Sequence, residues 1–163
     1  MGTDMKATCI SLLLLASAAL AQRPADIAVS TLGGETLELD SLARRGPTLV
    51  SFWALWCSPC KQELRALQSL FETYREQGFS LVAVNQDSPR SLAKVRSYVA
   101  SQRYTFPVVL DPNGQLLQRF NGQAIPYSVM LDSTGAVLYS MVGYLPGDEA
   151  EIEQKLRTVL GSE

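Results

Sequence analysis

The sequence predicts an α/β fold in which a mixed central sheet carries helices on both faces and follows an N-terminal β-hairpin. Two observations lead to this class. Apolar runs at residues 48–54 and 79–84 flank an amphipathic helical pattern, which is the order of a parallel βαβ unit. Later in the chain, residues 127–131 and 136–142 have strand patterns joined by a short polar link, so these two strands are expected to be antiparallel.

The N-terminal hairpin is predicted from two short strand patterns, residues 27–29 and 36–39, on either side of the glycine pair at 33–34. Consecutive glycines suit a tight turn because they adopt positive φ angles without steric cost. Residues 48–54 come next, and their mostly apolar side chains indicate a buried central strand.

Two helices are predicted in the middle of the chain. The first follows residue 57 and repeats apolar side chains at spacings of three and four until Gly78 ends it. These side chains are Leu64, Leu67, Leu70, Phe71 and Tyr74. The second helix opens at Ser88 and Pro89, a pair typical of a helix N-terminus, and stops near Gln102.

The last third of the chain completes the sheet and closes the fold. Residues 106–110 are expected to be extended, residues 111–114 to form a turn, and residues 116–120 to form one helical turn. After the antiparallel strand pair, residues 147–160 have the pattern of an amphipathic helix. We find no internal repeat, so residues 22–163 are expected to form one domain.

The composition is that of a globular protein and excludes several function classes. Of 163 residues, 47% are apolar and 18% are charged, and the net charge is −2. This charge balance lacks the excess of basic residues that is typical of proteins that bind nucleic acid. Because the chain has no histidine, it cannot form a Ser/His/Asp or Cys/His catalytic arrangement, or any metal or haem site that depends on imidazole.

Residues 1–21 have the pattern of a signal peptide. Lys6 precedes an apolar stretch at residues 10–20, and Ala-Leu-Ala at residues 19–21 offers a cleavage site before Gln22. The apolar run of about 12 residues is shorter than the roughly 20 that span a bilayer. We therefore expect an exported, periplasmic or extracytoplasmic protein. The alternative is that the segment is retained as a loose anchor.

Of the three cysteines, only Cys57 and Cys60 belong to the expected mature domain. Cys9 lies at the start of the apolar stretch and is interpreted as part of the signal. A disulfide between residues as close as 57 and 60 closes too small a loop to remove much chain entropy. We therefore expect this pair to serve in thiol chemistry and not in stabilising the fold.

The junction between strand and helix gives Cys57 the environment of a reactive thiol. Unpaired backbone N–H groups and the helix dipole favour negative charge there, so we expect the pKa of Cys57 to lie below that of a free cysteine. Cys60, one turn further along, should be the more buried thiol and should resolve a mixed disulfide on Cys57. Two alternatives are half of a metal site, which would need further ligands, and a merely structural pair.

Residues 51–60, SFWALWCSPC, resemble the active-site strand and turn of thioredoxin-like proteins. The segment KQE at 61–63, with FPVVLD at 106–111 and IPYSVMLD at 125–132, resembles the exported TlpA/ResA type, which includes proteins of cytochrome c maturation. The resemblance covers nearly the whole expected mature chain. It implies a three-layer thioredoxin-like fold and a protein disulfide oxidoreductase whose two cysteines form a redox-active disulfide.

The resemblance also implies roles for three further residues. Pro126 matches a cis-proline that faces the disulfide, and the backbone of Ile125 would pair with an extended substrate segment. Trp56 would cover the reactive sulfur and contact the partner. The alternative for Trp56 is a half-buried core aromatic.

Glu63 is the candidate proton carrier. Thioredoxins proper have a buried aspartate where this chain has Ser51, and a serine hydroxyl is no base near neutral pH. The TlpA/ResA type instead has a glutamate three residues after the second cysteine, which Glu63 matches. Because residues 60 and 63 share one helix face, we expect Glu63 to tune the thiols and to move the proton of Cys60. The alternative is a solvent-exposed helix glutamate.

The resemblance favours a reductant of disulfide-containing exported proteins, in cytochrome c maturation or a general redox role, re-reduced by a membrane thiol carrier. No dinucleotide motif or P-loop occurs in the sequence, so we expect no cofactor. We also expect a monomer.

Two other functions stay open. A thiol peroxidase of the peroxiredoxin kind would have threonine in place of Ala54, and Trp56 would crowd its site. A Cu(I) carrier could use both cysteines, but the chain lacks histidine and a methionine cluster near Cys57.

Overall fold

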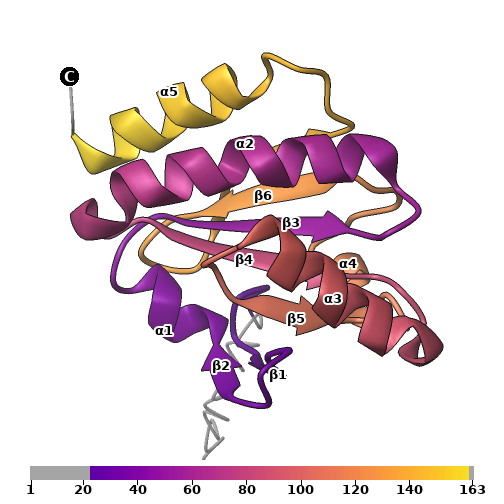
Figure 1. The fold of residues 1–163 in the computed structure, drawn as a ribbon. Coiled ribbons are helices and arrows are strands. Elements are labelled where there is room, and N and C mark those ends of the chain that lie inside the picture. The colour runs from indigo at the N-terminus through magenta and orange to yellow at the C-terminus, as the bar shows by residue number, and fades with distance from the viewer. Residues whose placement is uncertain (1–22, 162–163) are drawn as a thin grey trace, which may run out of the picture.

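The computed structural model describes residues 23–161 and confirms the predicted three-layer, thioredoxin-like fold (Figure 1). The expected signal peptide, with Cys9 inside it, lies outside the described residues. Within residues 23–161, none of the helices combines the length and the apolar character that crossing a membrane requires.

A five-stranded mixed sheet runs through the centre of the molecule in the order β5-β4-β3-β6-β7. Its first three strands in that order are parallel, and the last two alternate in direction. The strands are β3 (Thr48–Trp53), β4 (Ser80–Asn85), β5 (Val108–Leu110), β6 (Tyr127–Leu131) and β7 (Val137–Val142). The mixed sheet predicted from the two apolar runs and the late strand pair is therefore confirmed.

Helices cover both faces of this sheet. One face carries α2 (Ser58–Tyr74), α3 (Leu92–Gln102) and α5 (Glu149–Leu160), whose buried side chains share one apolar cluster. In Figure 1, α2 and α5 lie side by side above the sheet. The other face carries the short helices α1 (Leu39–Ala43) and α4 (Gln115–Arg119), which pack into a second cluster.

The central strand β3 contributes to both clusters because its side chains alternate between the two faces. Leu49 and Trp53 point toward the α2 side, whereas Val50 and Phe52 point toward the α1 side. All six residues of β3 are buried, as expected for a strand covered on both faces.

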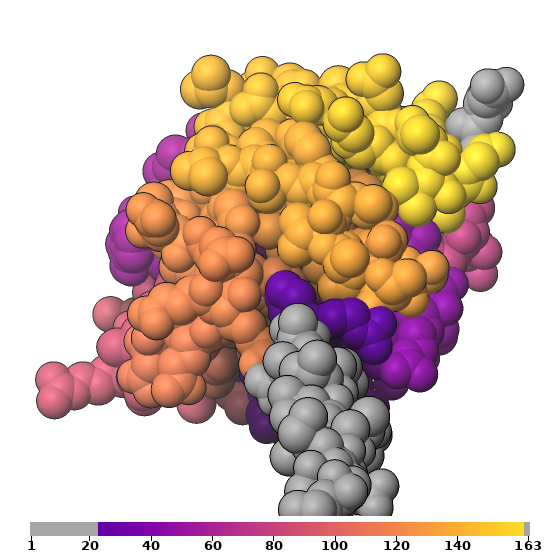
Figure 2. Space-filling view, turned by 180° about the vertical axis from the view of Figure 1, so that it is seen from behind, coloured from indigo at the N-terminus to yellow at the C-terminus, as the bar shows by residue number. Residues whose placement is uncertain are grey.

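The N-terminal residues form the predicted hairpin, an antiparallel pair of β1 (Ala28–Ser30) and β2 (Thr36–Glu38). The Arg119 side chain on α4 fastens this region to the domain by donating hydrogen bonds to the carbonyl oxygens of Arg23, Pro24 and Asp26, at 2.9–3.1 Å. Figure 2 shows these first described residues, in indigo, lying against the orange and golden surface of the second half of the chain.

The start of two helices differs from the sequence prediction. Leu39, expected to end the second hairpin strand, instead begins α1, because Leu39, Leu42 and Ala43 bury one face of a short helix. Ser88 and Pro89 were expected to open the second helix, but residues 89–91 form a 3₁₀ turn, η2 (Pro89–Ser91), and α3 begins after it. A second 3₁₀ turn, η1 (Arg75–Gln77), continues α2 to Gly78, whose φ of 95° ends it as predicted.

Candidate active site

The cysteine pair lies at the carboxyl end of β3, where residues 54–57 lead into α2. β4 runs parallel to β3 on one side and β6 runs antiparallel on the other. The segment after β4 and the segment before β6 therefore lie at this same edge of the sheet. Register pairs Phe52 with Tyr127, so the preceding residue, Pro126, lies near the end of β3 as well.

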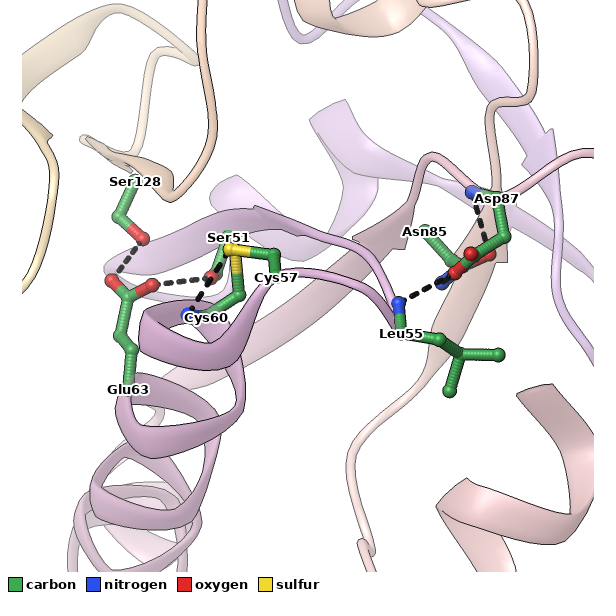
Figure 3. The surroundings of a disulfide bond; sticks show 8 residues. All are labelled: Ser51, Leu55, Cys57, Cys60, Glu63, Asn85, Asp87 and Ser128. Carbon is green, nitrogen blue, oxygen red and sulfur yellow. Dashed lines mark hydrogen bonds between the residues drawn. A yellow bond between two sulfur atoms is a disulfide. The ribbon is translucent and has the colours of Figure 1, made fainter. Parts of the chain in front are cut away.

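Cys57 and Cys60 form a disulfide across the first turn of α2 (Figure 3). Cys57 is the N-cap residue of the helix, and its sulfur accepts a hydrogen bond from the backbone N–H of Cys60 at 3.2 Å. Pro59 lies in the first turn, where a missing N–H leaves no helical hydrogen bond unmade. Cys57 is 5% exposed and Cys60 is fully buried. Of the two cysteines, only Cys57 therefore borders solvent.

Glu63 lies fully buried beneath the disulfide, on the side of α2 that faces the sheet. Its two carboxylate oxygens accept hydrogen bonds from the hydroxyls of Ser128, at 2.6 Å, and Ser51, at 3.3 Å (Figure 3). Burial raises the pKa of Glu63 to about 7, against the opposing effect of these two hydrogen bonds. The alternative of a solvent-exposed helix glutamate is wrong, because α2 turns this position into the core.

A second polar network fixes the loop that leads to Cys57. The carboxylate of Asp87, after β4, accepts hydrogen bonds from the backbone N–H of Leu55 and from the side chain of Asn85, both at 2.8 Å. The side chain of Asn85 in turn accepts the backbone N–H of Asp87 at 3.1 Å. Asn85 and Asp87 are both buried, so this network ties the active-site loop to the neighbouring strand (Figure 3).

The three residues to which the resemblance gave binding roles lie at the same edge. The Ile125–Pro126 peptide bond is cis, as expected. Trp56 is 72% exposed, so the alternative of a half-buried core aromatic is wrong. Within residues 23–161, the backbone N–H and C=O of Ile125 make no hydrogen bond.

Sequence reasoning assigned no role to Ser128, Asn85 or Asp87. Ser128 lies in an apolar strand, and Asn85 ends another one. Polar side chains at such positions are a usable signal, because burial without a hydrogen-bond partner is costly. Ser128 contacts Glu63 and Asp87 contacts Leu55, and these partners lie far away in sequence, so the two contacts emerge only in the folded chain.

The comparison with protein families matches residues 20–140 to the model of the AhpC/TSA family. Sporulation thiol-disulfide oxidoreductase A of Bacillus subtilis is 29% identical over 77% of this chain and 76% of its own. Thiol-disulfide oxidoreductase ResA of Geobacillus kaustophilus is 28% identical over 77% and 71%.

A solved structure from Chlorobium tepidum, described as a thiol:disulfide interchange protein DsbE, has the same fold. It superposes with a TM-score of 0.78 at 29% identity, covering 86% of this chain and 96% of its own. The sequence relatives and the structural neighbour thus agree with the TlpA/ResA resemblance drawn from the motifs.

Proposed function

This chain belongs to the AhpC/TSA family, and from that premise we propose that it is a reductant of disulfides in exported proteins. Its general activity follows from its relatives: it is a thiol–disulfide oxidoreductase of the ResA, StoA and DsbE type with the pair Cys57 and Cys60. The observation that carries the proposal is the fully buried carboxyl group of Glu63 on the helix of a cysteine pair in which Cys57 borders solvent and Cys60 does not.

The proposed reaction begins with the Cys57 thiolate attacking one sulfur of a substrate disulfide. A mixed disulfide forms with Cys57, and the other substrate sulfur leaves as a thiolate. The thiol of Cys60 then loses its proton and attacks the Cys57 sulfur, which expels the second substrate thiolate. The substrate gains two electrons, and the protein is left with the disulfide that the structure contains.

Glu63 is the proposed acceptor of the Cys60 proton. A carboxyl group with a pKa of about 7 can take up and release a proton near neutral pH. When a donor dithiol later reduces the protein, Cys60 leaves as a thiolate and Glu63 returns the proton. Because Cys60 and Glu63 are both fully buried, a protein group is needed for this transfer.

Trp56, Ile125 and Pro126 are the proposed contacts for the substrate. The exposed ring of Trp56 offers apolar surface beside Cys57. The unpaired backbone of Ile125 can hydrogen-bond an extended segment as an added strand would. Pro126 would place that backbone at the edge where the disulfide lies.

We further propose that residues 1–21 direct export and that the partners are disulfide-containing proteins outside the cytoplasm. A reductant there needs a source of electrons, since that compartment favours disulfides. A membrane thiol carrier would supply them as a dithiol. Proteins of cytochrome c maturation are one substrate class consistent with the motif resemblance.

The direction of the reaction is tested by the reduction potential, measured in glutathione buffers, and by reduction of insulin. We expect a potential at or below roughly −220 mV, in the range of cytosolic glutathione and thioredoxin. A potential near the roughly −120 mV of DsbA would make the protein an oxidant and overturn the proposal. Cys57→Ser should abolish insulin reduction.

The substrate class is tested by trapping with Cys60→Ala in the exporting cell. This variant should accumulate mixed disulfides through Cys57, and the captured proteins should carry export signals. Hydrogen peroxide turnover by the wild type serves as the comparison. Fully buried Ala54 provides no hydroxyl for a peroxidase site, so peroxide consumption faster than disulfide reduction would favour the peroxidase instead.

A further inference from the structure

A pair of serines on neighbouring strands lies directly beneath Glu63. Ser51 of β3 and Ser128 of β6 are partners in the antiparallel register, so their side chains point to the same face of the sheet. Both are fully buried. They are flanked along their strands by large apolar side chains, which makes this pair a polar point in an otherwise apolar layer.

The sheet leaves space for a carboxyl group at this point. On its other side Ser51 is paired with Ala83 of β4, so three small side chains follow one another across the sheet under the first turns of α2. Larger residues flank this row, among them Leu49 and Trp53. Glu63 reaches into the row from α2, and both of its oxygens find hydroxyl donors there.

These contacts fix a side chain that the helix alone would leave mobile. A glutamate side chain has several rotatable bonds, and its ordering costs free energy. We propose that Ser51 and Ser128 are positioning residues that hold the Glu63 carboxyl group beneath Cys60 and set its affinity for the proton of that thiol. This inference rests on the proposed role of Glu63 in thiol–disulfide exchange.

The two hydrogen bonds should differ in strength. The bond from Ser128 is shorter, at 2.6 Å, than the bond from Ser51, at 3.3 Å, and hydrogen bonds to an ionised group weaken as they lengthen. A serine hydroxyl can also accept a hydrogen bond. Each serine can therefore donate a hydrogen bond to the carboxylate and accept one from the O–H of the neutral acid, which suits a group that cycles between both forms.

Other titratable groups surround Glu63 and must stay unchanged in the test. Asp148, before α5, raises the pKa of Glu63, although less than burial does. Tyr139 of β7 and Tyr144 interact electrostatically with Glu63. Cys60 lies one turn before it on α2. None of these groups is altered by replacing either serine.

The test is the titration of Glu63 by carbon NMR in Ser128→Ala and Ser51→Ala, using the oxidised protein so that neither Cys57 nor Cys60 titrates. We expect Ser128→Ala to raise the pKa of Glu63 by roughly one unit or more, and Ser51→Ala to raise it by less. Ser128→Thr keeps a hydroxyl, so the pKa of Glu63 in this variant should stay close to the wild-type value. Ser140→Ala, at an exposed serine of β7, is the matched control and should leave the titration unchanged.

The second measurement is the pH profile of insulin reduction, which a merely structural serine would not move. The profile of Ser128→Ala should shift in the same direction as its Glu63 titration. Unchanged titrations in both alanine variants would overturn the inference while leaving the exchange reaction intact. Serine-dependent titrations in a wild type that reduces no disulfide would instead overturn the proposed function. Should Ser128→Ala not fold, Ser51→Ala and Ser128→Thr decide the same question.

Discussion

At the scale of single residues, the candidate site depends on a carboxyl group placed where water cannot reach it. Glu63 is fully buried, and burial disfavours its charged form more than two serine hydroxyls favour it. A glutamine would fill the same space without ionising. The presence of glutamate therefore costs stability at neutral pH, which is consistent with the proposed role of Glu63 in proton transfer.

We predict that Glu63 makes the oxidised protein less stable as pH rises from about 4.5 to about 7. In that interval the folded protein keeps the proton on Glu63 while the unfolded chain has lost it, so folding binds a proton and weakens as protons become scarce. The loss amounts to about 3 kcal/mol once pH exceeds the folded-state pKa. Urea unfolding at a series of pH values measures it.

Glu63→Gln removes this dependence and serves as the reference. The difference in unfolding free energy between variant and wild type should grow in favour of the variant across that interval. Glu72→Gln, at an exposed position on the same helix, is the control and should retain the loss of stability that Glu63 causes. A wild-type curve parallel to that of Glu63→Gln would show that Glu63 does not titrate in this range.

At the scale of elements, the active-site loop depends on a tether between two strands. Leu55 lies between β3 and α2, and its backbone N–H is held by the carboxylate of Asp87 beyond β4. This contact spans neighbouring parallel strands at their carboxyl ends. The position of Cys57 at the start of α2 therefore depends on β4 as well as on the chain that carries it.

Asp87→Ala should lower the unfolding free energy by about 1–3 kcal/mol, because it leaves the Leu55 N–H and the Asn85 side chain without their partner. It should also slow disulfide exchange by loosening the loop before Cys57. Chemical denaturation and insulin reduction measure the two effects. Asp148→Ala removes a similar hydrogen bond, to Leu145 in an exposed turn, and should cost less stability. Equal losses of unfolding free energy in both variants would contradict the tether.

At the scale of the whole molecule, the sheet separates two apolar clusters that contain different parts of the chain. The cluster under α2 and α5 includes both cysteines. The cluster on the other face joins α1, α4 and the start of the described chain. Alternate side chains of β3 point into the two clusters, so the clusters are joined through the backbone of β3 while their side chains lie on opposite faces of the sheet.

We predict that a cavity in the second cluster weakens the fold without changing the redox chemistry. Leu116→Ala, at a buried position on α4, should cost about 2–5 kcal/mol of unfolding free energy. The reduction potential should stay as in the wild type, because the oxidised and reduced proteins lose the same packing. Guanidinium unfolding and glutathione equilibration measure the two quantities. A shifted potential would reveal coupling across the sheet.

The sequence alone determined the fold class and the reactive pair. The apolar runs at β3 and β4, the polar link between β6 and β7, and the spacing of Cys57 and Cys60 are local patterns, and local patterns reflect backbone geometry directly. The short helix α1 was not predicted from the sequence, because five residues are too few to show a helical periodicity of apolar side chains. The cis bond before Pro126 was expected from family resemblance and from no local signal.

The tertiary structure alone decided the environment of Glu63. Sequence allowed this residue to be either a buried proton carrier or an exposed helix glutamate, since both fit one helical pattern. Burial depends on which face of α2 meets the sheet, and hydrogen bonding depends on strand register, which pairs Ser51 with Ser128 across a long stretch of chain. The pKa of a buried group depends on burial and on such non-local contacts, so it is determined only when the strands are in place.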